Sequence, residues 1–499
     1  MHRARRSSLR WIPFVILLLA ILYRGWILLR YSVQYVDDDQ ALLWNATAAY
    51  ARFIVPEPFF WGQAYNAMLE AAVAAPLYWL RVPLHYALPI AAMLISAFPY
   101  GLIAALFYRK KHAAVCCLVL CAYLLMGWQW DILTSIPRTF LAGIPFAVMG
   151  ALLINSGKSG RSAFAGGLLA VTGAAMTHTA LIPAGLGYLF WLLACKQKRK
   201  TGSMLALGSA LGVLGYILAK NFYAVNTEYS LHPDIPISFS RDIFESNLKR
   251  LPDMLSDFVF SNAGIVFVLL LLILGMFAFY LWKRRWISAV LLASDIALFF
   301  VLLALNYTGE YIEDSILYSQ TRMFLYLTYS LLLICWLDCL QYGVPSVPEK
   351  ARRIVIIGFS LLALISCCYK MTALTAQIDQ PESVLHHATV VIESDVEGLL
   401  EQCAQVAVLA EKHQADVILV NKNRTFAYAF DALHFGDYIV YHSLYDRRTW
   451  NYVQMLQRAD HRCIVVDFPS GVLSTEFVQL TDQAVTDYVR ERWGLNRRP

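Results

Sequence analysis

The chain has 499 residues, of which 59% are hydrophobic and 15% are charged, and its mean hydropathy is +0.52. Soluble domains average roughly 45–50% apolar and about 25% charged residues, so the composition indicates a membrane protein with several spans and excludes an ordinary soluble enzyme. The net charge of +6 comes from lysine and arginine in loops and gives no ground for nucleic-acid binding.

The apolar windows have the length that a helix needs to cross a bilayer of ~30 Å. The first window follows the basic segment Arg3–Arg6 and is too long for the core of a signal peptide, so we predict an uncleaved membrane helix. The eleven predicted spans are 11–29, 86–107, 113–131, 139–155, 163–179, 180–195, 203–222, 263–282, 287–306, 323–340 and 354–372. We therefore predict an α-helical polytopic membrane protein with about 11 transmembrane helices.

Basic clusters fall on every second loop between these spans, for example at 109–111, 196–200 and 283–285. Cytoplasmic loops carry an excess of lysine and arginine. The N-terminus is therefore predicted to be cytoplasmic, most simply in a bacterial plasma membrane. The loops 31–85, 221–262 and 307–322, together with the tail after residue 372, are predicted to lie outside.

Two domains follow from the change in composition: a transmembrane module over 1–372 and a small extracytoplasmic α/β domain over 373–499. If the tail is extracytoplasmic, a disulfide between Cys403 and Cys463 is allowed. The predicted elements of the tail are helices at 394–414, 425–433 and 474–492 and strands at 415–420, 438–441 and 463–467.

Three consecutive acids, Asp37-Asp38-Asp39, follow the first span, and Glu70 lies on a predicted surface helix further along the same loop. Carboxylates beside a membrane helix are costly to hold near lipid and are candidates for function by default. One interpretation is a solvated loop with helix-capping aspartates. The other is a general base that takes a proton from an acceptor hydroxyl. Consecutive side chains diverge, so only one or two of the three can serve one site.

The chain shows no P-loop and no GxGxxG between strand and helix, so a nucleotide donor is not indicated. An activated donor in the outer leaflet, such as a lipid-linked phosphate, fits a protein that is almost all membrane.

The first outer loop then carries a family resemblance. After the acidic residues, Trp61–Ala71 leads into Ala74–Leu77 and resembles this loop in the bacterial glycosyltransferase C superfamily, the protein-mannosyltransferase and aminoarabinose-transferase type that uses polyprenyl-phosphate sugars. Gln320–Leu327 is similar to an arginine-led segment that opens a late span in that family. Thr425–Leu433, followed by Asp446–Arg448, resembles the end domain of bacterial members.

This resemblance implies that Asp38 or Asp39 is the general base, because the pair stands in the family's usual relation to the aromatic Trp44. Asp37 is then solvated, and an Asp37→Asn variant is expected to behave almost normally. The sequence establishes no cofactor. A divalent cation, Mg²⁺ or Mn²⁺, is a possible cofactor, and Asp38 and Asp39 are its candidate ligands.

Five further residues are candidates for substrate binding: Glu70, Gln63, Tyr65, Arg138 and Arg322. Glu70 is a candidate for binding the acceptor or ordering the site. Arg322 and Arg138 each allow two interpretations. A guanidinium fork suits a donor phosphate, whereas an arginine at the end of a span also serves as an interfacial anchor.

Three more polar residues lie at the ends of spans. Asp131 is expected to pair with Arg138 across the outer ends of two spans. Arg24 either snorkels to the interface or has a phosphate or aspartate partner. His178 is expected to be a satisfied polar residue.

The predicted function is that of a membrane glycosyltransferase that moves a sugar from a polyprenyl-phosphate donor to a glycan, lipid or protein acceptor with inversion. A polymerase or ligase that moves a whole lipid-linked glycan is the nearest alternative. A lipid or glycan transporter or flippase is the alternative from another class, and it predicts acidic residues inside the spans.

Overall fold

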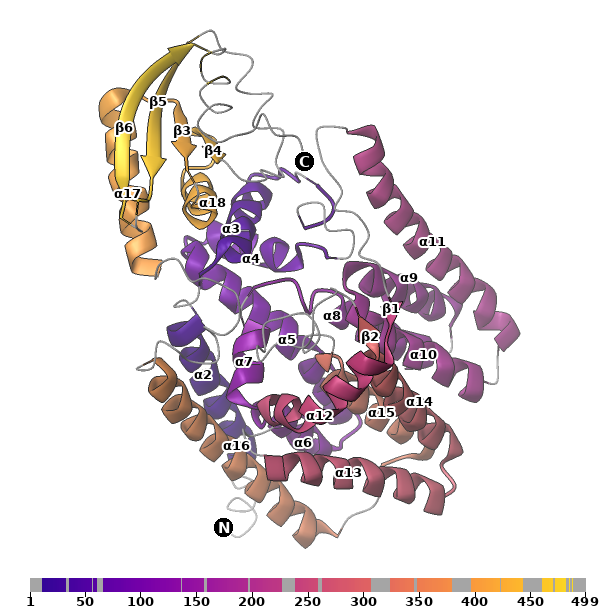
Figure 1. Ribbon diagram of the computed structural model, residues 1–499. Helices are drawn as coiled ribbons and strands as arrows, with labels where there is room; N and C mark the ends of the chain where they lie inside the picture. The colour runs from indigo at the N-terminus through magenta and orange to yellow at the C-terminus, as the bar shows by residue number, and fades with distance from the viewer. Residues whose placement is uncertain are drawn as a thin grey trace.

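The structure is a computed structural model in which several segments are left undescribed. It describes residues 11–32, 36–55, 57–60, 66–135, 137–156, 159–195, 198–226, 238–258, 263–306, 324–344, 348–378, 396–421, 423–442, 460–469, 472–481, 484 and 487. Helices form most of the molecule, and a small sheet with two helices lies at one end (Figure 1).

Each of the eleven predicted windows holds a helix. Five are long and apolar enough to cross a membrane: α2 (Ile12–Ser32), α5 (Leu84–Arg109), α11 (Lys198–Val225), α14 (Trp286–Leu303) and α16 (Glu349–Ile378). Five more helices are shorter: α6 (Ala113–Leu124), α8 (Ile144–Ser156), α9 (Gly160–Met176), α10 (Leu181–Ala194) and α15 (Leu327–Tyr342). α13 (Ala263–Trp282) has 20 residues and is strongly apolar, but the part of it whose side chains are described, Leu270–Trp282, is shorter than a span. The number of eleven crossings therefore stays a prediction.

Glycine lets three of these helices approach backbone to backbone. A Cβ atom on Gly150 of α8 would lie 2.5 Å from the backbone nitrogen of Ala170 in α9, and one on Gly208 of α11 would lie 2.1 Å from the carbonyl oxygen of Phe164 in α9. Small residues at helix interfaces are the usual solution in membranes, where close van der Waals contact replaces the hydrophobic effect. These glycines allow α8, α9 and α11 to form a tightly packed group.

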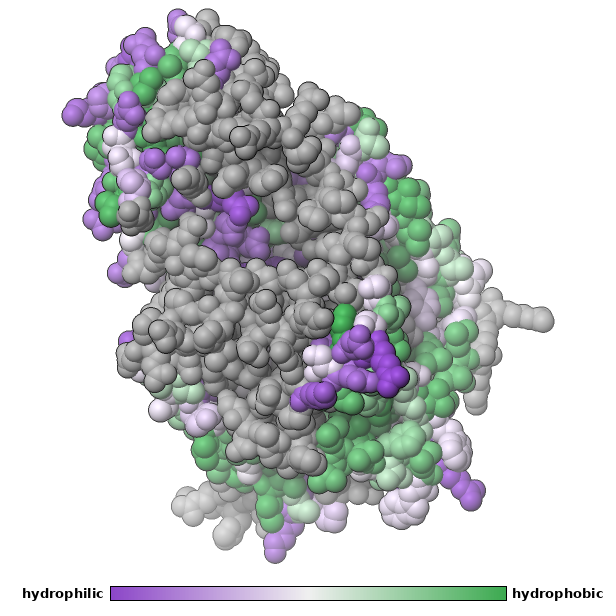
Figure 2. Space-filling model, viewed as in Figure 1, coloured by the Kyte–Doolittle hydropathy of each residue, from purple (hydrophilic) through white to green (hydrophobic). Residues whose placement is uncertain are grey.

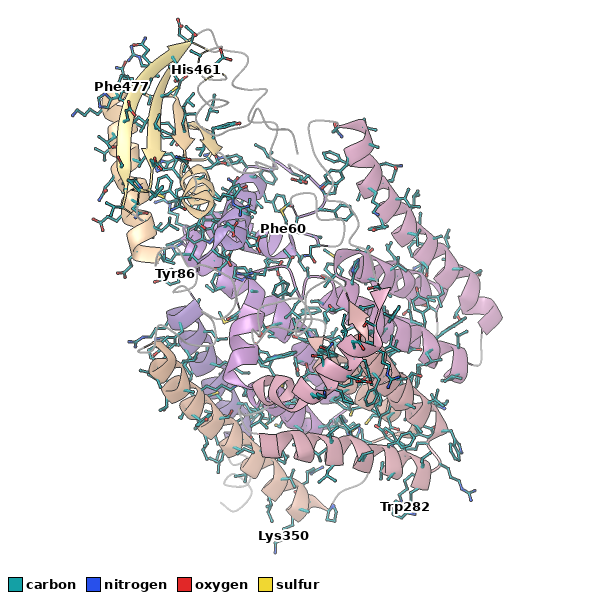
Figure 3. The ribbon with its side chains drawn as sticks, in the orientation of Figure 1. Phe60, Tyr86, Trp282, Lys350, His461 and Phe477 are labelled. Atoms are coloured by element: carbon teal, nitrogen blue, oxygen red, sulfur yellow. The ribbon has the colours of Figure 1, made fainter. Side chains whose placement is uncertain are left out.

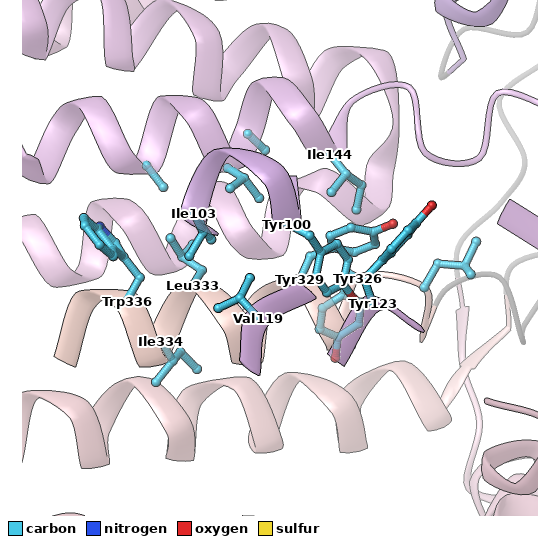
Figure 4. Packing of buried hydrophobic residues seen from close by; sticks show 14 of the residues in the cluster. Tyr100, Ile103, Val119, Tyr123, Ile144, Tyr326, Tyr329, Leu333, Ile334 and Trp336 are labelled. Atoms are coloured by element: carbon cyan, nitrogen blue, oxygen red, sulfur yellow. The ribbon is translucent and has the colours of Figure 1, made fainter. Parts of the chain in front are cut away.

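Tyrosines fill the centre of the helical part. Tyr100 of α5, Tyr123 of α6 and Tyr329 of α15 are buried, and the Tyr100 ring centroid lies 5.1 Å from that of Tyr123 and 5.4 Å from that of Tyr329. Figure 4 shows these rings gathered at one end of a core whose other end holds Trp336. Aromatic pairs at such distances add favourable edge and offset contacts to the area that they bury.

A buried charge cluster joins three helices, and it corrects the predicted pairing of Asp131. Asp131 of α7 (Trp128–Ser135) accepts hydrogen bonds from Arg24 of α2 at 2.7 Å and from Lys370 of α16 at 2.8 Å. All three side chains are almost fully buried. Arg24 therefore has the aspartate partner, and Asp131 does not pair with Arg138. The expected pairing was wrong because Lys370 lies far away in sequence but beside α7 in space.

The segment predicted to be the first outer loop, residues 31–85, holds two helices, α3 (Asp38–Ala51) and α4 (Leu69–Trp79); we continue to call it the first outer loop. The helical part also contains the 18-residue helix α12 (Arg241–Phe258) and three short elements: the one-turn helix η1 (His178–Ala180) and the antiparallel pair β1 (Ser238–Phe239) and β2 (Leu305–Asn306). α4 lies at the surface with one buried face, and its Ala72, Pro76 and Trp79 are exposed. Its Glu70, Ala71, Ala74 and Ala75 are buried, because alanine lets neighbouring helices approach closely on that side.

The tail folds as a small α/β unit. Its sheet has the order β4-β3-β5-β6, with β3 parallel to β4 and β5, and with β6 antiparallel to β5. Its elements are α17 (Val396–His413), β3 (Val417–Val420), α18 (Arg424–Leu433), β4 (Ile439–His442), β5 (Asp460–Asp467) and β6 (Ser474–Thr481). Cys403 and Cys463 are free, buried thiols.

The predicted helix over 474–492 was wrong at its beginning, because Ser474–Thr481 is strand β6. Val478 and Leu480 pack against the sheet core, and the residues between and before them are exposed. This alternation has the period of two that belongs to a strand with one buried face.

The α/β unit shares its hydrophobic core with the first outer loop. Phe426 and Phe430 of α18 lie in one cluster with Leu43 of α3 and with residues of α4 and the start of α5. Asn45 of α3 also donates a hydrogen bond to Asp431 of α18 at 2.5 Å. The unit is therefore seated on the loop that carries the three aspartates.

The two ends of the molecule differ in character. In Figure 2 the coloured residues along the lower and right-hand side of the helical part are mostly hydrophobic, whereas hydrophilic residues are more frequent over the α/β unit at the upper left. Figure 3 shows Trp282 and Lys350 at the end opposite to His461 and Phe477 of the sheet. The basic segments next to Trp282 and Lys350 thus lie far from the α/β unit, as the predicted topology requires, and the sidedness in a membrane stays a prediction.

Candidate functional site

The acidic cluster begins helix α3. Asp37 is the N-cap residue, and its side chain accepts a hydrogen bond from the backbone N–H of Gln40 at 3.0 Å. Asp38 and Asp39 occupy the first helical turn, where a negative charge interacts favourably with the helix dipole. The side chain of Asp37 is only 5% exposed, whereas those of Asp38 and Asp39 are 37% and 42% exposed. The three adjacent acids thus have different environments.

Arg138 lies between two of these acids. It follows α7 in the chain, and its side chain is 7% exposed. Its guanidinium forms an ion pair with the Asp37 carboxylate and lies 3.5 Å from Oδ2 of Asp39. A guanidinium has a planar fork of donors that can engage more than one carboxylate oxygen. The structure therefore brings Arg138 to the predicted catalytic cluster.

The α/β unit contributes a second guanidinium. Arg424, the first residue of α18, lies 3.6 Å from Oδ2 of Asp38. Both side chains are more than a third exposed, so the pair contributes little to stability, but it places a cation from the tail beside the aspartates. The sequence signal for this residue is the N-cap Asn423, whose side chain accepts the N–H of Phe426 at 2.9 Å and thereby fixes where α18 begins.

Glu70 lies at the start of α4 and is 3% exposed. Burial raises its pKa to about 7, although hydrogen bonds from the backbone N–H groups of Glu70 and Thr139 lower it in part. Its second carboxylate oxygen, Oε2, has no hydrogen-bond partner among the described residues. Glu70 is thus joined to the loop of Arg138 through Thr139, the next residue in the chain.

Another buried carboxylate, Glu57, lies in the same outer loop and was not predicted. Glu57 is 2% exposed, and it accepts a hydrogen bond from the Tyr223 hydroxyl of α11 at 2.7 Å. Burial, and secondarily the Glu57 charge, raises the pKa of Tyr50 in α3 to about 12. The only signal in the sequence was an acid between two prolines in an aromatic loop.

An apolar groove of about 230 Å³ lies between α4, α5 and α8. It is lined by Leu69, Val73, Leu94, Ile95, Phe98, Pro145, Phe146 and Met149. Leu94 and Phe98 are exposed. Leu69 directly precedes Glu70 in α4, so the groove begins next to this buried carboxylate.

Three predicted site residues, Gln63, Tyr65 and Arg322, lie outside the described residues, and their roles stay predictions. In the part of the chain that the structure describes, no group of three or more His, Cys, Asp or Glu side chains is arranged to hold a metal ion. Asp38 and Asp39, the candidate ligands of a divalent cation, each face a guanidinium instead.

The chain matches no protein-family model and no curated protein sequence. Among solved structures, it is similar to the crystal structure of ArnT from Cupriavidus metallidurans bound to undecaprenyl phosphate. The two chains are 10% identical, the match covers 92% of this chain and 93% of that one, and the TM-score is 0.49. No residue of this chain takes a role from that comparison.

Proposed function

We propose that the chain is a membrane glycosyltransferase of the glycosyltransferase C type, which uses a polyprenyl-phosphate sugar on the outer face of the membrane. One observation carries this proposal. Two reachable carboxylates, Asp38 and Asp39, lie beside two guanidinium groups, where the first outer loop meets the α/β unit. A transfer of this kind needs a base for the acceptor and cations for the donor phosphate.

In the proposed reaction, Asp38 or Asp39 takes the proton of the acceptor hydroxyl. The resulting oxygen attacks the anomeric carbon, and the bond between that carbon and the phosphate oxygen breaks. The polyprenyl phosphate leaves with the bonding electron pair, and one displacement inverts the anomeric configuration. Exposed fractions of 37% and 42% leave these two carboxylates reachable, whereas Asp37 is enclosed by its cap and its ion pair.

The donor fits two features of the site. Its phosphate would meet Arg138 or Arg424, together with Arg322 as the sequence suggests, because guanidinium is the side-chain group best suited to bidentate phosphate contacts. Its prenyl tail would lie in the apolar groove beside Leu69 and Pro145. No step is assigned to Mg²⁺ or Mn²⁺, because the aspartates that would bind the ion contact guanidinium groups instead. The acceptor is a glycan, lipid or protein of the cell envelope.

The test is complementation of a deletion strain, with the envelope glycans profiled by mass spectrometry. The wild-type chain should restore the missing sugar, and Asp38→Asn or Asp39→Asn should not, since loss of a general base costs about 10²–10⁴-fold in rate. Asp242→Asn, at an exposed acid in the first turn of α12, is the matched control and should restore it. Full restoration by both Asp38→Asn and Asp39→Asn would refute the proposed base.

One observation favours the transporter alternative. Asp295 lies in the middle of α14 and is 1% exposed, so an acid does occur inside a predicted span. Carboxylates at such depth often mark transport pathways. Its Oδ2 accepts a hydrogen bond from Ser330 of α15 at 2.8 Å. A lipid-flipping assay in vesicles tests this alternative: Asp295→Asn should abolish flipping if the acid serves transport, and should leave sugar transfer intact if our proposal holds.

A further inference from the structure

The residue after Arg138 has an unusual backbone. Thr139 has a φ of +63° and is fully buried. The left-handed region is uncommon for any residue other than glycine, and for a β-branched residue it is a real outlier. Such conformations persist only where the surrounding structure holds them, and they often occur at functional sites. The question is what holds Thr139 in this state.

Contacts from two directions hold its backbone. The Thr139 N–H interacts with the buried Glu70 carboxylate of α4, and this interaction lowers the Glu70 pKa. The Thr139 carbonyl accepts a hydrogen bond from Oγ1 of Thr177 at 3.3 Å, and the same Oγ1 accepts the N–H of Gly143 at 3.2 Å. The N–H of Ala142 also donates to the Thr139 carbonyl at 3.2 Å, so this backbone is held by its own turn as well as by α4 and the α9–η1 junction.

The surrounding backbone leaves this loop little freedom. A Cβ atom on Gly143 would lie 2.0 Å from the carbonyl oxygen of Gly173 in α9. On the other side, the N–H of Ala67 donates to the carbonyl of Met176 at 3.3 Å, which ties the start of α4 to the end of α9. Packing at this density transmits a displacement instead of absorbing it.

We propose that Glu70 and Thr177 are positioning residues that hold Thr139 in its left-handed conformation, and thereby aim the Arg138 guanidinium at Asp37 and Asp39. The direction of the Arg138 side chain depends on the backbone at residues 138 and 139, because its own ion pairs lie at the far end of a long flexible chain. Glu70 then acts through the loop and does not touch substrate. The effect on sugar transfer rests on the proposed function, but the clamp itself does not.

The first test measures hydrogen–deuterium exchange of the purified full-length protein over residues 137–143. Glu70→Ala removes the acceptor of the Thr139 N–H and should raise exchange in this segment. Glu70→Gln keeps a carbonyl acceptor and should raise it far less. Glu397→Ala, at an exposed acid in the first turn of α17, is the matched control. Equal exchange in Glu70→Ala and wild type would overturn the clamp, whatever reaction the protein catalyses.

The second test uses the backbone strain itself. Glycine adopts positive φ without a steric cost, so Thr139→Gly should restore activity to a Glu70→Ala protein, in which the clamp is lost. We expect kcat/KM for the donor to fall by about 10²-fold in Glu70→Ala, the size of effect that a misplaced group near the reaction produces. The double variant should recover most of this loss, and Thr139→Ala in the same background should not.

If Glu70→Ala fails to fold, Thr177→Val with and without Thr139→Gly gives the same comparison from the other side of the loop. Recovery by glycine supports positioning. No recovery, in a protein that folds and binds the polyprenyl phosphate, would mean that Glu70 and Thr177 act in another way and would overturn the inference. A wild-type protein that neither binds nor uses a lipid phosphate would refute the proposed function alone, because the exchange experiment would still stand.

Discussion

Asp37 provides the sharpest test of how the acidic cluster is built. Its carboxylate has two roles: it caps α3 by accepting the Gln40 N–H, and it forms an ion pair with the buried Arg138. An Asp37→Asn variant keeps the first role, because asparagine caps helices as well as aspartate does. It loses the second, so the variant isolates the ion pair. The sequence alone suggested that this variant would behave almost normally, and the structure predicts the opposite.

The expected cost follows from the burial of both partners, whose side chains are 7% and 5% exposed. Removing one partner of a buried ion pair costs about 3–5 kcal/mol, because the other charge remains without compensation. Asp39 at 3.5 Å still offsets part of the Arg138 charge, so we expect a value near the lower end, about 3 kcal/mol. Asp37→Ala should cost about 1 kcal/mol more through the lost cap.

The assay is unfolding of the purified protein in detergent, followed by heat or denaturant. Asp39→Asn is the control, and it should cost less than about 1 kcal/mol because its side chain is 42% exposed. The double variant Asp37→Asn with Arg138→Gln should be more stable than Asp37→Asn alone, since no buried charge is left over. If Asp37→Asn is as stable as Asp39→Asn, the buried pair has no energetic importance and our account of the cluster is wrong.

Three other predictions use different parts of the molecule. The pKa of Glu70 rises from its usual 4.5 to about 7 on folding, so the folded chain holds this proton more tightly than the unfolded one. The tighter binding of the Glu70 proton stabilises the folded chain fully below pH 4.5. This contribution, about 3 kcal/mol in all, is lost as the pH rises to 7. The thermal midpoint of Glu70→Gln should not show this decrease between pH 4.5 and 7. A Glu70→Gln protein with the same pH dependence as wild type would contradict the raised Glu70 pKa. Asp131→Asn leaves two buried cations and should destabilise by about 3–5 kcal/mol, with partial recovery when Lys370→Met is added; no recovery would argue against the charge cluster. A reporter fused at residue 198 should be cytoplasmic and one after residue 380 extracytoplasmic, and the same location for both would refute the predicted topology.

The sequence by itself determined where the long apolar helices lie, but not the more polar helices α3 and α12 in the predicted loops. Backbone groups in lipid must be satisfied within a helix, so each spanning segment shows itself as a local run of apolar residues, and all eleven windows hold helices. It also located the acidic cluster and the alternating helices and strands of the tail, because charge and hydrophobic periodicity are local properties. Only the end of the tail was assigned wrongly at Ser474–Thr481, where a short amphipathic segment fits both periods.

Only the tertiary structure decided which charged side chains pair with one another. Arg138 meets Asp37, Arg424 meets Asp38, and Asp131 meets Lys370, and each pair joins segments about 100 residues or more apart. Nothing local encodes such a meeting, because it depends on how whole helices pack. Burial has the same origin: neighbouring acids such as Asp37 and Asp38 look alike in the sequence, yet the fold encloses one and leaves the other exposed. The pairing and burial of its charged groups, and with them the chemistry that we propose, are therefore properties of the fold.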